Sequence, residues 1–325
     1  MAILKARVQA LRHEADGIVS MELRPATDAV PFPEFEAGAH IDLHLPNGLV
    51  RNYSLMNPDT GVRQYRIAVL NDRHSRGGSR YVHEQLRVGT ILDISEPRNH
   101  FTLDRGAEYS VLVAGGIGVT PLLGMLHALA AAGKPAEFIY CARSRREAAF
   151  IEDIQSCAAQ TGIGLACHFD DERGGPPDLA RLLQGRSAEA HFYCCGPGPM
   201  LDAFERVCAE LGYAHVHIER FAAAEEATNP AQPEADAGGY SVELRRSART
   251  LHVPAGKPLL DVLLEAGVSH DYSCREGLCG ACETRVLDGE VEHRDSILTK
   301  SEREANNTMM VCVSGCRKGP LVLDL

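Results

Sequence analysis

Tryptophan is absent from this chain of 325 residues, and no run of 18 apolar residues occurs anywhere in it. A helix that spans a bilayer needs about 20 consecutive apolar residues, so a membrane-spanning segment is not expected. The sequence also has no basic stripe. Its 33 Lys and Arg residues are outnumbered by 44 Asp and Glu residues, which gives a net charge of −11. Nucleic-acid binding needs clustered Lys and Arg. We therefore expect neither a membrane nor a nucleic acid as partner.

A secretory signal is not expected either, because basic side chains interrupt the short apolar pattern of the opening "MAILKARVQALRHEADG" and no small-residue cleavage site follows. The cysteines number eleven. An odd number in such a chain argues against a disulfide framework and favours metal binding or redox chemistry. We expect a cytoplasmic protein and take a monomer as the working assumption.

The length exceeds what one hydrophobic core usually fills, so three domains are expected. Short strand patterns with turns over residues 1–103 predict an antiparallel β-barrel. Strands alternate with helix patterns over residues 104–224, which predicts an α/β domain with a parallel sheet. Residues 225–238, rich in Ala, Glu and Pro, predict a linker. A hairpin pattern and a helix pattern then open a third domain over residues 239–325.

The segment "CREGLCGAC" is the densest in cysteine. Its cysteines, Cys274, Cys279 and Cys282, have the spacing C-x4-C-x2-C, and Cys312 follows after 29 intervening residues. This is the spacing of plant-type [2Fe–2S] sites, in which four thiolates ligate two irons. The two glycines within the segment suit a backbone wrapped tightly around a cluster.

Two alternatives to this assignment remain open. A structural zinc site normally uses two C-x2-C pairs, and only Cys279 and Cys282 form such a pair here. Cys316 competes with Cys312 for the role of fourth ligand, although the spacing favours Cys312.

The strand pattern "RNYSL" carries residues suited to a flavin. Alternation places Arg51 and Tyr53 on one face and Asn52 and Ser54 on the other. A flavin needs an aromatic or apolar platform for its ring and a cation for its phosphate, which Tyr53 and Arg51 can supply. An ordinary barrel strand with an exposed arginine explains the same letters equally well.

A glycine turn follows in "SRGGSRYVHEQL". Gly77 and Gly78 precede Ser79, which we expect to cap a helix whose free N–H groups favour phosphate. Alone, the turn is more simply a helix start, but together with Arg51 it predicts a clamp for the flavin phosphate.

In "VLVAGGIGVTPLLGML" a buried strand leads through a glycine turn into a helix. Gly116 and Gly118 match the first part of the dinucleotide fingerprint G-x-G-x-x-G, but Pro121 replaces the third glycine. We expect backbone amides of this turn and the Thr120 hydroxyl to meet a pyridine nucleotide.

The segment after the second strand, "CARSRREAAF", bears on the choice of nucleotide. No acidic residue ends the strand, and Arg143, Arg145 and Arg146 suit a 2′-phosphate, which by itself favours NADPH. Further along, Asp170 and Asp171 precede a glycine turn and predict a solvated loop.

The segments "DYSCREGLCGAC" and "MMVCVSGC" resemble the ferredoxin domain of the phthalate dioxygenase reductase family, whose members contain FMN and serve Rieske-type oxygenases. The resemblance extends over essentially the whole chain. It implies a β-grasp plant-type ferredoxin domain, FMN as the flavin and NADH as the donor. It further implies nucleotide contacts at Arg143 and Ser144, nicotinamide positioning at Cys195, and packing of Phe221 near the flavin.

The resemblance therefore implies an NADH-dependent reductase that passes electrons through FMN to a [2Fe–2S] cluster. A Rieske-type aromatic-ring dioxygenase or demethylase would receive them. Flavin is the expected intermediate because a nicotinamide releases two electrons as hydride while the cluster takes one at a time. Two alternatives are a redox-sensing flavin and iron–sulfur protein and a stand-alone flavin or quinone reductase.

Overall fold

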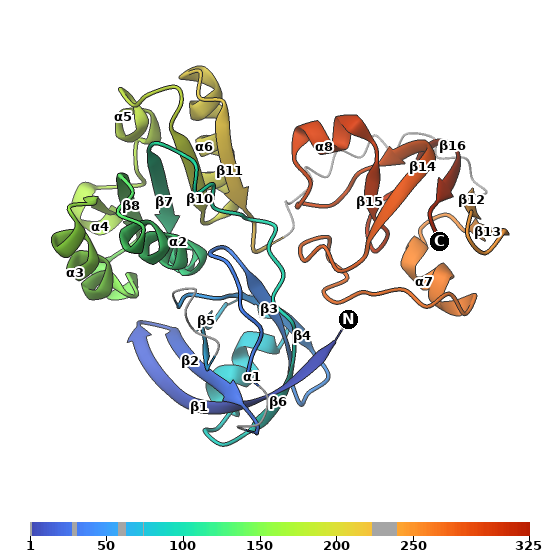
Figure 1. The fold of residues 1–325 in the computed structure, drawn as a ribbon, viewed down its shortest axis with the longest axis horizontal. Helices are drawn as coiled ribbons and strands as arrows, with labels where there is room; N and C mark the ends of the chain where they lie inside the picture. Colours follow the sequence, from blue (N-terminus) through green and yellow to red (C-terminus); the bar gives the residue numbers. More distant parts are fainter. Residues whose placement is uncertain (1, 28–30, 58–62, 74, 223–238) are drawn as a thin grey trace. The chain divides into compact units, whose positions relative to one another are not determined.

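The computed structural model describes residues 2–27, 31–57, 63–73, 75–222 and 239–325 (Figure 1). Contacts within the chain define two compact units, of which the first ends at Glu219 and the second begins at Arg220. The linker expected over residues 225–238 lies outside the described residues. Within the described ranges, none of the helices combines the length and the apolarity needed to cross a lipid bilayer.

Six antiparallel strands in the order β4-β3-β6-β1-β2-β5 form the first sheet. They are β1 (Ile3–Ala15), β2 (Ile18–Pro25), β3 (His40–His44), β4 (Val50–Ser54), β5 (Tyr65–Leu70) and β6 (Ile91–Ser95), with helix α1 (Gly78–Glu84) between β5 and β6. Strands β4 and β5, at the two ends of this order, also contact each other, so the sheet curls into a barrel. Burial alternates as a half-buried strand requires: Ala6 and Val8 are buried while Lys5 and Arg7 are exposed.

Five parallel strands in the order β11-β10-β7-β8-β9 form the second sheet. The strands are β7 (Ser110–Gly115), β8 (Ala136–Ala142), β9 (Gly164–Phe169), β10 (His191–Cys195) and β11 (His215–Glu219). The helices are α2 (Val119–Ala131), α3 (Ile151–Thr161), α4 (Asp170–Arg173), α5 (Leu179–Leu183) and α6 (Gly198–Glu210), with short turns η1 (Gly116–Gly118) and η2 (Arg145–Glu147). The chain runs from β7 outward to β9 and returns on the other side of β7 with β10. The strand order therefore reverses between β7 and β10, the place where open parallel sheets bind ligands.

Side chains of the parallel sheet pack alternately on its two faces. On β10, Tyr193 and Cys195 join the core beneath α2 and α3, whereas Phe192 and Cys194 join the core beneath α5 and α6. The alternation follows from the two-residue period of a strand.

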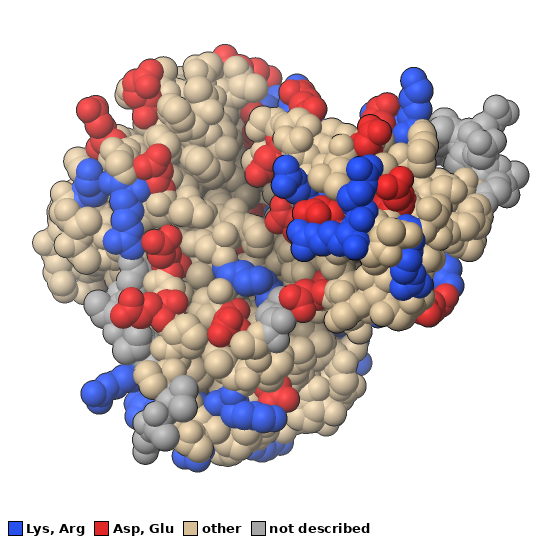
Figure 2. All heavy atoms as spheres, turned by 45° about the vertical axis from the view of Figure 1, so that its right-hand side comes forward, with Lys and Arg blue, Asp and Glu red and all other residues tan. Residues whose placement is uncertain are grey.

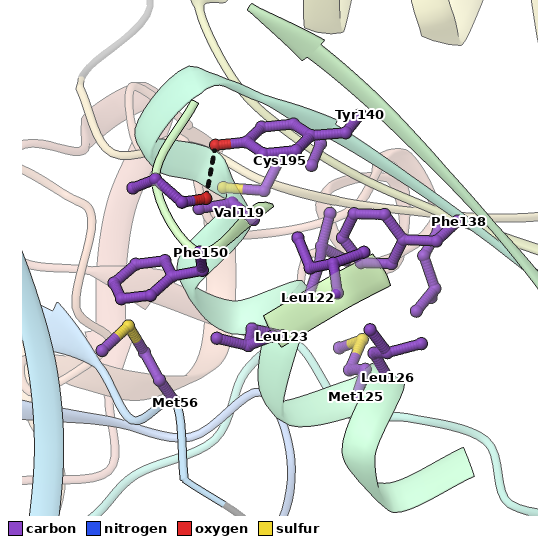
Figure 3. Close-up of a cluster of buried hydrophobic side chains, with 14 of the residues drawn as sticks. Met56, Val119, Leu122, Leu123, Met125, Leu126, Phe138, Tyr140, Phe150 and Cys195 are labelled. Carbon is purple, nitrogen blue, oxygen red and sulfur yellow. Dashed lines mark hydrogen bonds between the residues drawn. The ribbon is translucent and has the colours of Figure 1, made fainter. Parts of the chain in front are cut away.

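One hydrophobic cluster extends from the parallel sheet to the barrel, which also has a core of its own. Met56, from the segment after β4, lies beside Phe150 and Leu123 (Figure 3). A Cβ on Gly124 of α2 would lie 3.2 Å from the Leu55 carbonyl oxygen, so the glycine lets this segment approach the helix. The shared cluster explains why both sheets belong to one compact unit, and the boundary expected near residue 104 stays a prediction.

The second unit contains a five-stranded sheet in the order β13-β12-β16-β14-β15. Its elements are β12 (Tyr240–Leu244), β13 (Arg249–Val253), α7 (Leu259–Glu265), β14 (Glu283–Glu292), α8 (Lys300–Ala305), β15 (Thr308–Met310) and β16 (Gly315–Leu323). Only the β12–β16 pair is parallel among these ladders. Helix α7 buries Leu259, Leu260 and Leu263 in the same core as the sheet, which is the β-grasp arrangement. On the described part of the face in Figure 2, Lys and Arg side chains lie among Asp and Glu side chains.

Candidate cofactor sites

The loop between α7 and β14 and the turn after β15 bring four thiols together in two pairs. A hydrogen bond joins the side chains of Cys274 and Cys279, and another joins those of Cys282 and Cys312. Among the described residues, no three His, Cys, Asp or Glu side chains converge on the position of a single metal ion. Two pairs of thiols therefore suit a two-iron cluster better than a single zinc ion, which needs four ligands around one centre.

Backbone amides of the same loop point at the sulfurs. The amide of Glu276 donates to Cys274 Sγ at 3.3 Å, and the amide of Cys274 donates to Cys279 Sγ at 3.5 Å. The hydrogen bond from the Cys279 thiol and those from nearby amides lower the pKa of Cys274 to about 6. A thiolate is the form that binds metal, so the loop favours the ligating state of Cys274 near neutral pH.

Gly277 lets a second loop approach the cysteine loop. It has φ +68°, and a Cβ at this position would lie 2.9 Å from the Cα of Asp295. The Asp295 side chain is fully buried and accepts hydrogen bonds from the amides of Ile297 and Leu298. The amide of Ser296 donates to the Gly277 carbonyl at 3.0 Å. Asp295 thus supports the cysteine loop, a role that the sequence did not reveal.

Cys316, the competing fourth ligand, is engaged elsewhere. Its thiol donates to the Gly319 carbonyl at 2.8 Å, and it pairs with Val291 in the ladder of β14 and β16. Cys312, in contrast, is buried and its side chain is hydrogen-bonded to that of Cys282. The structure therefore brings together the four cysteines that the spacing favoured.

In the barrel, Arg51 lies against the glycine turn. A Cβ on Gly78 would lie 2.8 Å from both Cγ and Nε of Arg51. The expected cap at Ser79 is wrong: α1 begins at Gly78, and Gly77 precedes it with φ +102°. Glycine tolerates this left-handed conformation, so Gly77 caps the helix two residues before the expected position at Ser79. The Ser79 hydroxyl instead accepts a hydrogen bond from the amide of Asp72 at 3.3 Å.

Tyr53 and Ser54 leave β4 on opposite faces. Tyr53 packs against the barrel core, and burial raises its pKa to about 12 although Arg51 lowers it. The ring is therefore neutral at physiological pH and offers an apolar platform. Ser54 is buried and its hydroxyl donates to Glu219 Oε2 over 3.5 Å, the long limit of a hydrogen bond.

Glu219 is a site residue that the sequence reasoning missed. It ends β11 directly beside Cys195 of β10. Burial raises the pKa of its carboxyl to about 8, and the hydrogen bond from Ser54 lowers it only partly. At neutral pH the carboxyl is therefore mostly protonated. The one signal in the sequence was an acidic residue at the end of the strand pattern "HVHIE".

The turns after β7 and β10 pack against each other where the strand order reverses. A Cβ on Gly118 would lie 2.1 Å from the Cys195 carbonyl oxygen, whereas one on Gly116 would meet nothing within 4 Å. Gly116 has φ +54°. The Thr120 hydroxyl donates to the Ile117 carbonyl at 3.0 Å and the side chain is buried. Thr120 therefore holds the turn together, and its contact with a nucleotide stays a prediction.

Cys195 itself is fully buried beside Val119 and Tyr140 (Figure 3). Burial raises the pKa of its thiol well above the usual value, so it stays protonated. The Tyr140 hydroxyl donates to the Ala149 carbonyl at 3.0 Å, as the dashed line shows. Cys195 thus packs beneath the glycine turn that follows β7. Its contact with nicotinamide stays a prediction.

The remaining predicted residues lie elsewhere. Arg143 and Ser144 directly follow β8, at the same edge of the sheet as the glycine turn. Phe221 belongs to the second compact unit and is 42% exposed, and its packing against a flavin stays a prediction.

Two family models match the chain. The model described as "Oxidoreductase NAD-binding domain" matches residues 112–206, and "2Fe-2S iron-sulfur cluster binding domain" matches residues 242–317. The chain is 44% identical to the phenoxybenzoate dioxygenase subunit beta of Ectopseudomonas oleovorans, covering 100% of this chain and 98% of that protein. The solved structure of phthalate dioxygenase reductase matches with a TM-score of 0.70 and 33% identity, covering 100% of this chain and 98% of that one. The chain belongs to the phthalate dioxygenase reductase family.

The family resemblance and the fold class expected from the sequence are thereby confirmed. Vanillate O-demethylase oxidoreductase of Pseudomonas sp. strain HR199 is a further member at 42% identity, covering 99% of this chain and 100% of that protein. An intact type IV self-sufficient cytochrome P450 monooxygenase matches with a TM-score of 0.89 and 38% identity. That match covers 99% of this chain and 41% of the longer one. The chain is accordingly an NAD-dependent oxidoreductase with a [2Fe–2S] domain.

Proposed function

We propose that this reductase passes electrons from NADH through FMN to a [2Fe–2S] cluster and on to a Rieske-type oxygenase. The observation that carries the proposal is the paired arrangement of four thiols in the same chain as a nucleotide-binding sheet. Oxygenase systems are named for several relatives, among them the phenoxybenzoate dioxygenase subunit and the vanillate O-demethylase oxidoreductase.

The bound flavin supplies the conversion of a two-electron hydride donor into a one-electron source. The chain's own residues hold and orient it. Arg51, lying over the glycine turn at Gly78, presents a guanidinium to the phosphate. Tyr53 would offer its ring as a platform, and the pair of buried Ser54 and half-buried Glu219 would offer polar hydrogens without a net charge at neutral pH.

We further propose that the protein acts as a monomer in the cytoplasm. The eleven cysteines form no disulfide among the described residues, which suits a reducing compartment. NADH as electron donor is also available in that compartment.

An anaerobic visible spectrum, recorded before and after one equivalent of NADH, tests the proposal. Flavin and iron–sulfur bands should both be present, and both should bleach. A spectrum without iron–sulfur bands from folded, iron-replete protein would overturn the cluster assignment. A cluster band that stays oxidised while the flavin bleaches would overturn the electron path.

Quinone reduction is a second candidate function. A tetrachlorobenzoquinone reductase of Sphingobium chlorophenolicum is 43% identical to this chain, covering 96% of this chain and 94% of that protein. A quinone takes electrons directly from a reduced flavin, so this activity does not require the cluster. The two functions therefore differ in whether loss of the cluster abolishes them.

A further inference from the structure

The loop that follows β8 carries three arginines in four residues, namely Arg143, Arg145 and Arg146. Strand β8 neighbours β7, whose glycine turn faces the same edge of the sheet. In sheets of this kind, residues that follow the second strand contact the adenosine ribose, where an acidic residue binds the 2′-hydroxyl and an arginine binds a 2′-phosphate. By that rule alone the loop would select NADPH.

Arg145 is committed to a carboxylate of the neighbouring helix. Its Nε lies 2.5 Å from Glu172 Oε1 and its Nη2 lies 3.2 Å from Glu172 Oε2, a two-point pair. The guanidinium also stacks over the Phe169 ring, 4.5 Å from its centroid. The amide of Asp171 donates to the Arg143 carbonyl at 3.1 Å and holds α4 against the loop. Four contacts thus fix Glu172 and Arg145 side by side.

Arg143 makes a single ion pair with Glu147, four residues further along the chain. Its Nε lies 3.2 Å from Glu147 Oε2. Residues 143–147 and 170–173 together hold four arginines and four carboxylates. The expected solvated loop at Asp170 and Asp171 is instead the first turn of α4, which places Glu172 against Arg145. A 2′-phosphate would therefore meet a surface of no net charge.

We propose that Glu147 and Glu172 determine the preference of this chain for NADH by holding Arg143 and Arg145 away from a 2′-phosphate. The inference rests on the nucleotide site of the proposed function. Both pairs are exposed to solvent, so screening limits the effect to about tenfold for each glutamate.

The test compares two nucleotides that differ only in the 2′-phosphate, adenosine 2′,5′-bisphosphate and 5′-AMP, by isothermal titration calorimetry on the full holoprotein. The wild-type chain should bind 5′-AMP more tightly. Glu172→Gln should shift the ratio of the two dissociation constants toward the bisphosphate by about tenfold, because Arg145 is released. Glu147→Gln should shift it in the same direction, and the double variant should shift it further. Glu152→Gln, an exposed glutamate of α3, removes the same charge from the same sheet domain and should leave the ratio unchanged.

A second substitution in the Glu172→Gln variant identifies the arginine that causes the shift in the ratio of dissociation constants. Adding Arg145→Ala to Glu172→Gln should return the ratio to the wild-type value. A wild-type chain that already prefers the bisphosphate overturns the inference, as does a ratio in Glu172→Gln that equals the ratio in Glu152→Gln. Failure of the wild-type chain to bind either nucleotide would instead overturn the nucleotide site itself. If Glu172→Gln does not fold, Glu147→Gln with Arg143→Ala decides the question by the same measurement.

Discussion

The two ends of the electron path are built in opposite ways. Three of the four proposed cluster ligands lie within nine consecutive residues, and amides of that same segment point at their sulfurs. The proposed flavin and nucleotide site is gathered from strands far apart in the chain, and its Ser54–Glu219 contact joins residues 165 positions apart. The cluster site depends on a local loop, while the nucleotide site depends on the packing of two sheets.

This contrast predicts different kinds of failure. A local site is lost when a single ligand is replaced. It tolerates substitutions elsewhere in the chain, because neighbouring peptide groups fix much of its geometry. An assembled site is sensitive to any substitution that separates its parts, even one that touches no cofactor. The three substitutions below test the two cases in order of expected effect.

Cys279→Ser should have the largest effect, because it removes one proposed iron ligand from the loop. We expect loss of the iron–sulfur absorption and loss of electron delivery to an oxygenase, with NADH still bleaching the flavin. Cys316→Ser is the matched control and should keep the iron–sulfur bands. NADH-dependent quinone reduction by Cys279→Ser at the wild-type rate would favour the second candidate function for that substrate. Retention of a normal cluster spectrum would contradict the ligand assignment.

Gly118→Ala should break the assembled site without touching a ligand of the cluster. The added Cβ would lie 2.1 Å from the Cys195 carbonyl oxygen, and backbone atoms cannot move aside easily. We expect a loss of about 3 kcal/mol in the free energy of unfolding of the first unit, measured in urea. Gly116→Ala is the comparison: it meets nothing within 4 Å but keeps φ +54°, so a loss of about 1 kcal/mol is expected. Equal losses would mean that the two turns do not pack as described.

Glu219→Gln should have the smallest effect, and that effect should depend on pH. Burial raises the carboxyl pKa from its usual 4.5 to about 8, so the folded state holds a proton that the unfolded state releases. The stability contributed by protonated Glu219 is complete below pH 4.5 and is lost as the pH rises through 8. Between pH 5 and pH 8.5 the full pKa shift corresponds to a loss of about 4 kcal/mol relative to the variant. We expect about 2 kcal/mol, because Glu219 is only half-buried and solvent screens part of the effect.

Urea unfolding at several pH values measures this difference. The exposed Glu210→Gln should follow the wild-type curve across the whole range. A Glu219→Gln curve that is parallel to the wild-type curve would show that the carboxyl is already ionised in the folded state.

Much of the fold followed from local patterns. The strand patterns of the parallel sheet and the glycine turn at Gly116 occur where the sequence indicated, and the helix pattern of the third domain forms α7. The cap of α1 was misplaced because Ser79 has a good capping side chain, while the helix start depends on the left-handed φ of Gly77. Side-chain preference and backbone conformation competed there, and the backbone prevailed.

The site residues that the sequence did not reveal all depend on tertiary contacts. Asp295 reaches the cysteine loop only because Gly277 permits close approach. Glu172 meets Arg145 only because β8 and β9 are neighbours in the sheet. Neither contact has a periodic or local signature in the chain.

The sequence by itself predicted the four cysteines that are proposed as cluster ligands, and it determined the order of barrel, parallel sheet and ferredoxin domain. It could do so because the spacing of thiols within one loop and the periods of strands and helices are short-range properties. Only the tertiary structure decided that Glu219 lies half-buried beside Cys195 and Ser54, and that carboxylates pair with Arg143 and Arg145 after β8. The burial of a carboxyl and the pairing of distant charges depend on which strands become neighbours, a property of the whole fold.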